Sequence, residues 1–162
     1  MSLAGIRVLE LAAVGSGEGR PSTASGIAVA WVAKLFGDLG ADVIRVESAD
    51  GDDRVRSRPH ELHRWLTTNK RSIRHRLDEP IDALLGDADL VVHDGSWPEL
   101  APELVTAAWP GLVALAVTPF GQTGPYHDYA AEELSVIHGS SWGFLSPSAA
   151  TDITLPPLKA AG

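Results

Sequence analysis

The sequence contains no cysteine, which excludes a disulfide scaffold, thiolate chemistry and any metal site built on Cys. It also lacks a long apolar run, because Gly, Pro or a charged residue interrupts every hydrophobic stretch before it reaches the length of a membrane span. The first fifteen residues have no basic segment followed by a long apolar core, so they do not resemble a secretory signal. We therefore expect a cytoplasmic protein that does not enter a membrane.

Basic residues are scarce, with 13 Lys and Arg against 21 Asp and Glu and a formal net charge of -8. This balance argues against a nucleic-acid partner, because a phosphate backbone is gripped by clustered cations. More than half of the basic residues nevertheless lie in one short span, at Arg54, Arg56, Arg58, Arg64, Lys70, Arg71, Arg74 and Arg76. Such a local concentration is compatible with a phosphorylated cofactor.

The 162 residues are enough for one domain with a hydrophobic core, and 44% of them are hydrophobic. We expect this domain to occupy residues 1–145. Residues 146–162 are rich in Ser, Thr, Ala and Pro and show no periodicity, so they are predicted to connect to a further, C-terminal part that is missing here.

Short apolar runs predict strands at residues 6–11, 42–47, 88–93 and 112–117, with a shorter extended segment at 72–76. Helices are predicted at 24–39, 80–85, 98–109 and 130–140. Ile27, Trp31, Leu35 and Leu39 form the expected inner face of the first helix, and Leu100, Leu104, Ala107 and Ala108 that of the third. Residues 48–69 read as a polar, irregular segment. Strands alternating with helices predict an α/β fold with a Rossmann-like, doubly wound, mostly parallel sheet.

A glycine-rich loop follows the first strand, from Val14 to Gly19. Glycines let a backbone approach a phosphate closely at a helix N-terminus, and Glu47 after the second strand would suit a ribose in a dinucleotide site. The match to G-x-G-x-x-G is loose, the predicted helix starts several residues too late, and similar loops occur without a ligand. A dinucleotide site is therefore the weaker of the available interpretations.

Two further segments carry candidate ligand-binding groups. Lys70 and Arg71 are adjacent cations that would suit a pyrophosphate or a 3′-phosphate, although a solvated, salt-bridged edge explains them about as well. The segment from Phe120 to Tyr126 makes a tight turn through Gly121, Gly124 and Pro125 after a strand, where α/β folds place substrate loops.

Histidines are present at 60, 63, 75, 93, 127 and 138, but their spacing does not mark a third zinc ligand. We expect surface or loop histidines and no metal. A G-x-S-x-G segment is absent, so a serine hydrolase has no support in the sequence.

Five segments together resemble the N-terminal part of class III CoA-transferases, the family that includes the alpha-methylacyl-CoA racemases. They are GIRVLEL near the start, LGADVIRVE at 39–47, NKRSI at 69–73, DADLVVHD at 87–94 and FGQTGPY at 120–126. The resemblance implies a Rossmann-like CoA-binding domain and coenzyme A or an acyl-CoA as substrate. It also implies a homodimer of interlocked chains, or a complex with a chain that supplies the C-terminal part.

The resemblance also assigns residues. Val14 and Gly15 would lie beside the adenosine of CoA, and Lys70, Arg71 and His75 near its phosphates. At the end of the strand predicted at 88–93 the family commonly has E-N-F/Y-R-P-G, where this sequence has HDGSWP at 93–98. Asp94 would stand in place of the Asn, the aromatic residue and the Arg of the motif are absent, and Trp97 is a candidate substitute for stacking on adenine. Gly121 would belong to the substrate loop. Glu132 stands near the position of the racemase histidine.

The resemblance implies transfer of CoA between an acyl-CoA and a carboxylic acid, through an aspartate that forms covalent intermediates. That aspartate would follow Pro157–Gly162, so we expect little or no turnover by this chain alone. One alternative is epimerisation of a 2-methylacyl-CoA by proton exchange. Another is a non-catalytic CoA-binding or assembly subunit.

Overall fold

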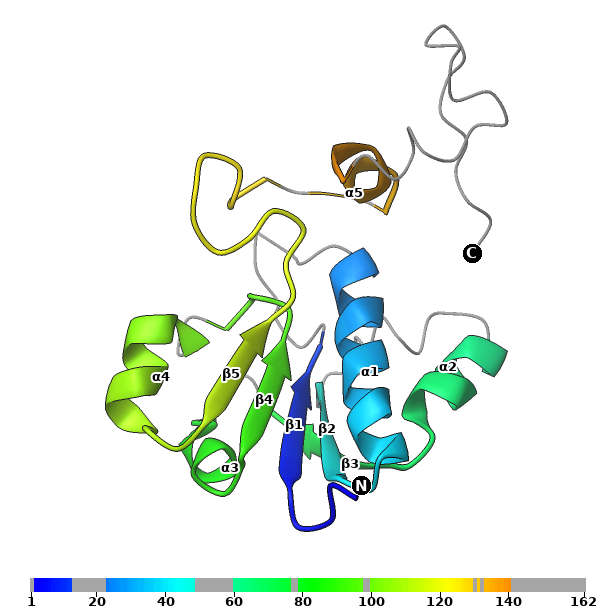
Figure 1. Ribbon diagram of the computed structural model, residues 1–162, viewed down its shortest axis with the longest axis vertical. Helices are drawn as coiled ribbons and strands as arrows, with labels where there is room; N and C mark the ends of the chain where they lie inside the picture. The colour runs from blue at the N-terminus through cyan, green and yellow to red at the C-terminus, as the bar shows by residue number, and fades with distance from the viewer. Residues whose placement is uncertain are drawn as a thin grey trace, which may run out of the picture.

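The computed structural model describes residues 2–12, 23–48, 60–76, 79–97, 100–129, 131 and 133–140 (Figure 1). The predicted ligand residues Val14, Gly15 and Glu132 lie outside these residues, and so does the predicted connection at 146–162. Among the described residues, no helix is long and apolar enough to cross a membrane.

A parallel sheet forms the centre of the described structure. Its strands are β1 (Arg7–Leu11), β2 (Asp42–Ser48), β3 (Lys70–His75), β4 (Leu90–His93) and β5 (Val113–Ala116), in the spatial order β3-β2-β1-β4-β5. Each neighbouring pair is parallel, with registers such as Leu9 opposite Ile44 and Leu9 opposite Val91. This order and direction confirm the Rossmann-like prediction.

Helices cover the two faces of the sheet (Figure 1). Helix α1 (Thr23–Asp38) packs on one face, where Val29 and Ala33 meet Val8, Val43 and Val92 from the strands. Helices α3 (Asp82–Gly86) and α4 (Pro102–Ala108) pack on the other, where a second core cluster contains Leu9, Leu11, Val46, Leu85, Val91 and Val105. The alternation of side chains along each strand divides the core into these two layers.

The expected inner face of helix α1 is wrong. Trp31, Leu35 and Leu39 are 48%, 50% and 55% exposed, whereas Val29 and Ala33 are fully buried. The fully buried positions of the helix hold small side chains, while Val32 and Phe36 pack beside them and are only partly buried. The large apolar residues were expected inside because periodicity alone does not show how near two elements come.

The segment after β2 contains a helix that the sequence did not predict. Helix α2 (His60–Thr67) buries Leu66 beside Ala30 of helix α1. Its Trp65 ring lies 4.6 Å from the Trp31 ring, so two half-exposed aromatic residues shield each other. The polar composition of residues 48–69 concealed this contact with helix α1.

The remaining helices are shorter than predicted. Helix α4 buries Val105, while the expected inner residues Leu104, Ala107 and Ala108 are exposed. Leu100 is buried as expected, but it precedes the helix. Helix α5 (Glu133–Gly139) lies beyond the carboxyl ends of the strands in Figure 1.

Candidate functional site

Open α/β sheets bind their ligands at the edge formed by the carboxyl ends of the strands. Strand β1 lies between β2 and β4, and the helices that follow β1 and β4 lie on opposite faces of the sheet. Open α/β sheets form a crevice where the chain switches faces in this way. The loops that follow β4 and β5 meet near this crevice.

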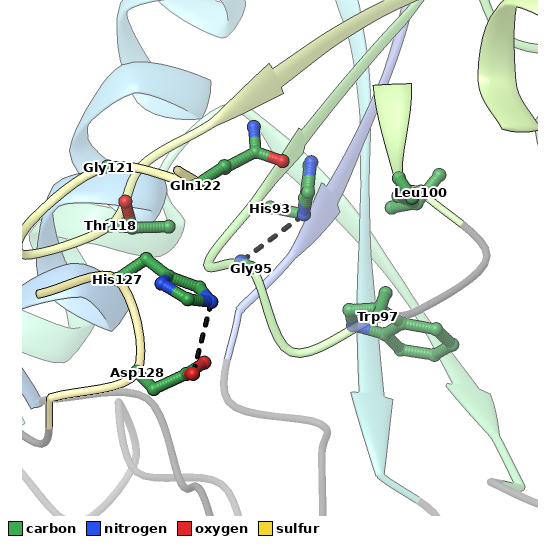
Figure 2. A pocket seen from close by; sticks show the side chains of 10 residues that line it. His93, Gly95, Trp97, Leu100, Thr118, Gly121, Gln122, His127 and Asp128 are labelled. Atoms are coloured by element: carbon green, nitrogen blue, oxygen red, sulfur yellow. Dashed lines mark hydrogen bonds and ion pairs between the residues drawn. The ribbon is translucent and has the colours of Figure 1, made fainter. Parts of the chain in front are cut away.

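A cavity of about 210 Å³ lies between those two loops (Figure 2). It is lined by His93, Gly95, Trp97, Leu100, Ala101, Thr118, Gly121, Gln122, His127 and Asp128. A second cavity of about 160 Å³ shares His93, Leu100 and Gln122 with it. The structure thus brings together two of the predicted ligand residues, Trp97 and Gly121.

The turn after β4 is held by Asp94, a predicted CoA ligand. Its carboxylate accepts hydrogen bonds from the Ser96 backbone N–H at 3.1 Å and from the Ser96 hydroxyl at 2.6 Å. Asp94 is only 3% exposed, so its described contacts shape the turn. Next to it Gly95 has φ +83°, and a Cβ there would lie 2.7 Å from the Thr118 methyl group. Only glycine lets the two loops approach this closely.

His93 ends strand β4 and is 2% exposed. Its Nδ1 accepts a hydrogen bond from the Gly95 backbone N–H at 3.2 Å, so the proton of the neutral ring is on Nε2. Burial lowers the pKa of His93, and the opposing effect of the Asp94 charge is smaller. The ring is therefore neutral near pH 7 and keeps one N–H donor.

Trp97 borders the cavity on the other side of that turn (Figure 2). Its indole Nε1 is buried and has no hydrogen-bond acceptor among the described residues. The indole ring lies 6.4 Å from the ring of His75, the predicted phosphate ligand that ends strand β3. His75 is 7% exposed, and its Nε2 lies 3.0 Å from the backbone oxygen of Glu79.

His127 and Asp128 supply the exposed rim of the cavity. The His127 Nε2 lies 3.0 Å from an Asp128 carboxylate oxygen, and its Nδ1 lies 2.6 Å from the backbone oxygen of Gly124. The pair belongs to the loop after β5, as Figure 2 shows. The tight turn at Gly121 and Gly124, both with positive φ, brings this loop back over the strand ends.

The two predicted phosphate cations lie at the start of strand β3, and the described cavity borders the ends of β4 and β5. The Lys70 ammonium group is 2.5 Å from the Glu10 carboxylate and donates to the Ala30 carbonyl oxygen at 2.7 Å. Its side chain is 1% exposed, and burial lowers the pKa of Lys70 against the opposing effect of Glu10. Arg71 is exposed and makes two hydrogen bonds to Asp42.

Glu47, the possible ribose ligand, is buried and lies 3.6 Å from the Arg45 guanidinium. The Arg45 group also lies 3.4 Å from Glu10. No group of three His, Cys, Asp or Glu side chains that could hold a metal ion occurs in the described part of the chain.

Sequence reasoning missed most of the polar groups in the cavity, namely His93, Thr118, Gln122, His127 and Asp128. The available signal was their position, because His93 ends β4 and the other four lie in the segment that follows β5 in the same parallel sheet. The prediction of surface or loop histidines is wrong for His93, which is buried. Its place at the end of an apolar strand indicated burial.

The family comparison agrees with this architecture. A family model described as CoA-transferase family III matches residues 3–152. The chain belongs to CoA-transferase family III. This finding confirms the resemblance that the five sequence segments indicated.

Curated CoA-transferases of family III are similar to this chain over most of its length. Succinate–glutarate CoA-transferase of Agrobacterium fabrum is 32% identical over 98% of this chain and 41% of its own length. The beta subunit of succinyl-CoA–L-malate CoA-transferase of Chloroflexus aurantiacus is 33% identical over 79% of this chain and 33% of its own length. The chain therefore spans less than half the length of either relative.

A solved structure supports the fold. The crystal structure of a hypothetical protein from Mycobacterium tuberculosis aligns with a TM-score of 0.66 and 21% sequence identity. The alignment covers 93% of this family III chain and 43% of the other chain.

Proposed function

We propose that this chain forms the CoA-binding part of a class III CoA-transferase, which moves CoA between an acyl-CoA and a carboxylic acid. Family membership over residues 3–152 carries the proposal. The cavity at the ends of β4 and β5 supports it, because ligands of open α/β folds bind at this edge.

The proposed chemistry is nucleophilic catalysis by a carboxylate. An aspartate carboxylate attacks the thioester carbonyl and displaces the CoA thiolate, which leaves an acyl–aspartyl anhydride. The thiolate then attacks the aspartyl carbonyl and releases the donor acid, so that CoA is held as an aspartyl thioester. The acceptor carboxylate undergoes the same two steps in reverse, which frees the aspartate and places CoA on the acceptor. We propose that this aspartate comes from sequence outside these 162 residues, either in the same polypeptide or in a partner chain. The part of the chain described above would then hold CoA, with little or no turnover alone.

Contacts to CoA are proposed for Trp97 and Gly121 at the cavity, for Asp94 in the turn between His93 and Gly95, and for His75 beside Trp97. Val14, Gly15 and Glu132 remain predictions from the sequence. Arg71 remains a proposed phosphate ligand, since its exposed guanidinium can exchange Asp42 for a phosphate. Lys70 would have to leave Glu10 to do the same, which makes it the weaker of the two.

Calorimetric titration tests the binding part of this proposal. We expect CoA to release or absorb heat with the 162-residue chain, and NAD⁺ under the same conditions to give none. NAD⁺ is the comparison because it carries adenosine and a 5′-pyrophosphate as CoA does, but lacks the 3′-phosphate and the pantetheine arm. Absence of binding by CoA, or binding of NAD⁺ alone, would contradict the proposal.

Isotope exchange tests the catalytic part. Succinyl-CoA is the donor to try first, because the compared Chloroflexus relative is named for it. Incubation with labelled succinate should place no label in succinyl-CoA when this chain is alone. Label should appear when the missing portion is supplied as a longer polypeptide or a partner chain, and persistent failure there would remove the transferase activity.

A non-catalytic CoA-binding subunit is the second candidate. The Chloroflexus relative is named as a beta subunit, so an assembly of unlike chains occurs within the compared proteins. Binding of CoA without isotope exchange in the complete assembly would favour this alternative.

A further inference from the structure

His93 offers a hydrogen-bond donor that the described structure does not use. The ring is 2% exposed, and Nδ1 is occupied by the Gly95 backbone N–H. Nε2 therefore carries the proton, and it has no hydrogen-bond partner among the described residues. Nε2 is not one of the fully buried side-chain atoms without a partner, although the residue as a whole is almost entirely buried. Since His93 lines the cavity, this N–H is open to an acceptor that arrives from outside.

Trp97 repeats this pattern at the same cavity. Its indole Nε1 is buried, can only donate, and has no acceptor in the described part of the chain. The side chains of His93 and Trp97 approach the cavity from either end of the turn at Gly95 (Figure 2). Two unused donors at one cavity form a more specific pattern than either alone.

The charges around the cavity restrict what the acceptor can be. No Lys or Arg occurs among the described lining residues, and the rim carries Asp128 paired with His127. A phosphate or carboxylate would meet the Asp128 charge without a strong cation to offset it. A neutral acceptor avoids that repulsion, and Gln122 offers a further donor and acceptor to such a group.

We propose that His93 Nε2 and Trp97 Nε1 donate hydrogen bonds to a neutral acceptor group of the bound CoA ester. This inference rests on the proposed function, since CoA is the ligand it assumes. Two parts of CoA have the required chemistry, namely the ring nitrogens of adenine and the amide carbonyl groups of the pantetheine arm. The cavity of about 210 Å³ would hold such a group and not the whole cofactor.

Two pairs of variants isolate the donors. His93→Gln keeps a side-chain N–H donor at a similar reach, and His93→Leu removes it. Trp97→Phe removes the indole donor and keeps an aromatic ring, while Trp109→Phe makes the same change at a half-buried Trp that does not line the cavity. Circular dichroism and thermal unfolding verify that each variant is folded before it is titrated.

Calorimetry with CoA then decides the proposal. We expect His93→Leu and Trp97→Phe each to raise the Kd for CoA by about threefold to tenfold, the usual range for one neutral hydrogen bond. His93→Gln, which keeps a donor, should raise the Kd less than His93→Leu does, and Trp109→Phe should leave the Kd close to that of the unmodified chain. If His93→Leu fails to fold, the comparison of the Kd for CoA between Trp97→Phe and Trp109→Phe is sufficient to test the proposal.

Titrations with adenosine 3′,5′-bisphosphate and with pantetheine identify the acceptor. If the variants lose affinity for both CoA and the bisphosphate, the acceptor is adenine. If they lose affinity for both CoA and pantetheine, the acceptor is an amide carbonyl group of the pantetheine arm. If CoA binds the unmodified chain and the folded variants equally, this inference is overturned while the proposed function stands. If CoA does not bind the unmodified chain, both are overturned.

Discussion

Lys70 and Glu10 form the most deeply buried ion pair of the described residues. Their side chains are 1% and 0% exposed, and the ammonium group reaches the carboxylate at 2.5 Å. Arg45 also approaches Glu10, at 3.4 Å. A buried pair of this kind adds little net stability compared with apolar residues, but its disruption leaves one charge uncompensated in a poorly solvated place.

Removal of Lys70 should therefore destabilise the fold. We expect Lys70→Ala to lower the free energy of unfolding by about 3–5 kcal/mol, because Glu10 would lose its nearest cation. Urea denaturation followed by circular dichroism measures this change. Arg71→Ala is the matched control, since Arg71 is 62% exposed and should change stability little. If both substitutions lower the free energy of unfolding equally, the larger effect expected from the burial of Lys70 is contradicted.

His93 should make stability depend on pH. Burial lowers the pKa of His93 in the folded state, so the unfolded chain, with an ordinary His pKa of about 6.5, binds that proton first as the pH falls. The neutral ring therefore contributes its full stability above the unfolded-state pKa of about 6.5, and this contribution is lost as the pH falls below that value. Asp94, His127 and Asp128 are the other titratable groups around this ring at the cavity.

Unfolding measured at pH 7.5 and pH 5.5 tests this direction, with both values chosen to bracket that pKa of about 6.5. The unmodified chain should lose more stability over this interval than His93→Gln, which has no titratable ring at that position. A profile of the same slope in both proteins would show that His93 is not the group responsible.

Gly37 sets how closely helix α1 approaches the sheet. A Cβ at this position would lie 3.0 Å from the Asn69 backbone oxygen and 3.4 Å from a Val43 methyl group. Both neighbours belong to the β2–β3 layer, and the backbone oxygen cannot turn away as a flexible side chain would. The glycine thus permits the packing that buries Val29 and Ala33 and leaves Trp31 outside.

Gly37→Ala should destabilise the chain although alanine favours helices. We expect overpacking against the Asn69 backbone oxygen to cost about 2–3 kcal/mol, which exceeds the gain of about 1 kcal/mol in helix propensity. Gly86→Ala in helix α3 is the control, because a Cβ there would meet nothing within 4 Å. Thermal unfolding of the two variants should move in different directions, and a stabilised Gly37→Ala would contradict the close approach.

The elements of this fold could be predicted more fully than the contacts between them. Runs such as LVVH predicted the strands, because β-branched and Leu side chains suit a sheet buried on both faces. The buried face of helix α1 could not be predicted, since its fully buried positions hold the small residues Val29 and Ala33, whereas Trp31 and Leu35 are half exposed. Lys70 looked like a ligand cation because its partner Glu10 is sixty positions away in the chain.

The candidate site could be predicted only as an edge of the sheet. Trp97 and Gly121 were expected there, and both line the cavity. His93 and Gln122 were missed because their joint location depends on β4 and β5 being neighbours with parallel registers. That pairing is a property of the folded sheet, and neither segment has a local sequence pattern that predicts it.

The molecule as a whole should become more stable when CoA binds. A ligand that binds only the folded chain raises its stability by about 2.7 kcal/mol at a concentration one hundred times its Kd. For a domain of this size each kcal/mol corresponds to about 2–4 °C in Tm. We expect a rise of this order with CoA in differential scanning calorimetry and none with NAD⁺. An unchanged Tm at saturating CoA would contradict specific binding.

The contact between Gly95 and Thr118 restricts which sequences this architecture accepts. Any side chain at position 95 must tolerate φ +83° and must also avoid the Thr118 methyl group, which a Cβ would approach to 2.7 Å. Natural variants that retain the fold should therefore alter the two positions jointly, with glycine lost at 95 only where 118 has become smaller. Joint changes at positions 95 and 118 among related sequences would therefore provide evidence on the shape of the cavity that is independent of mutagenesis.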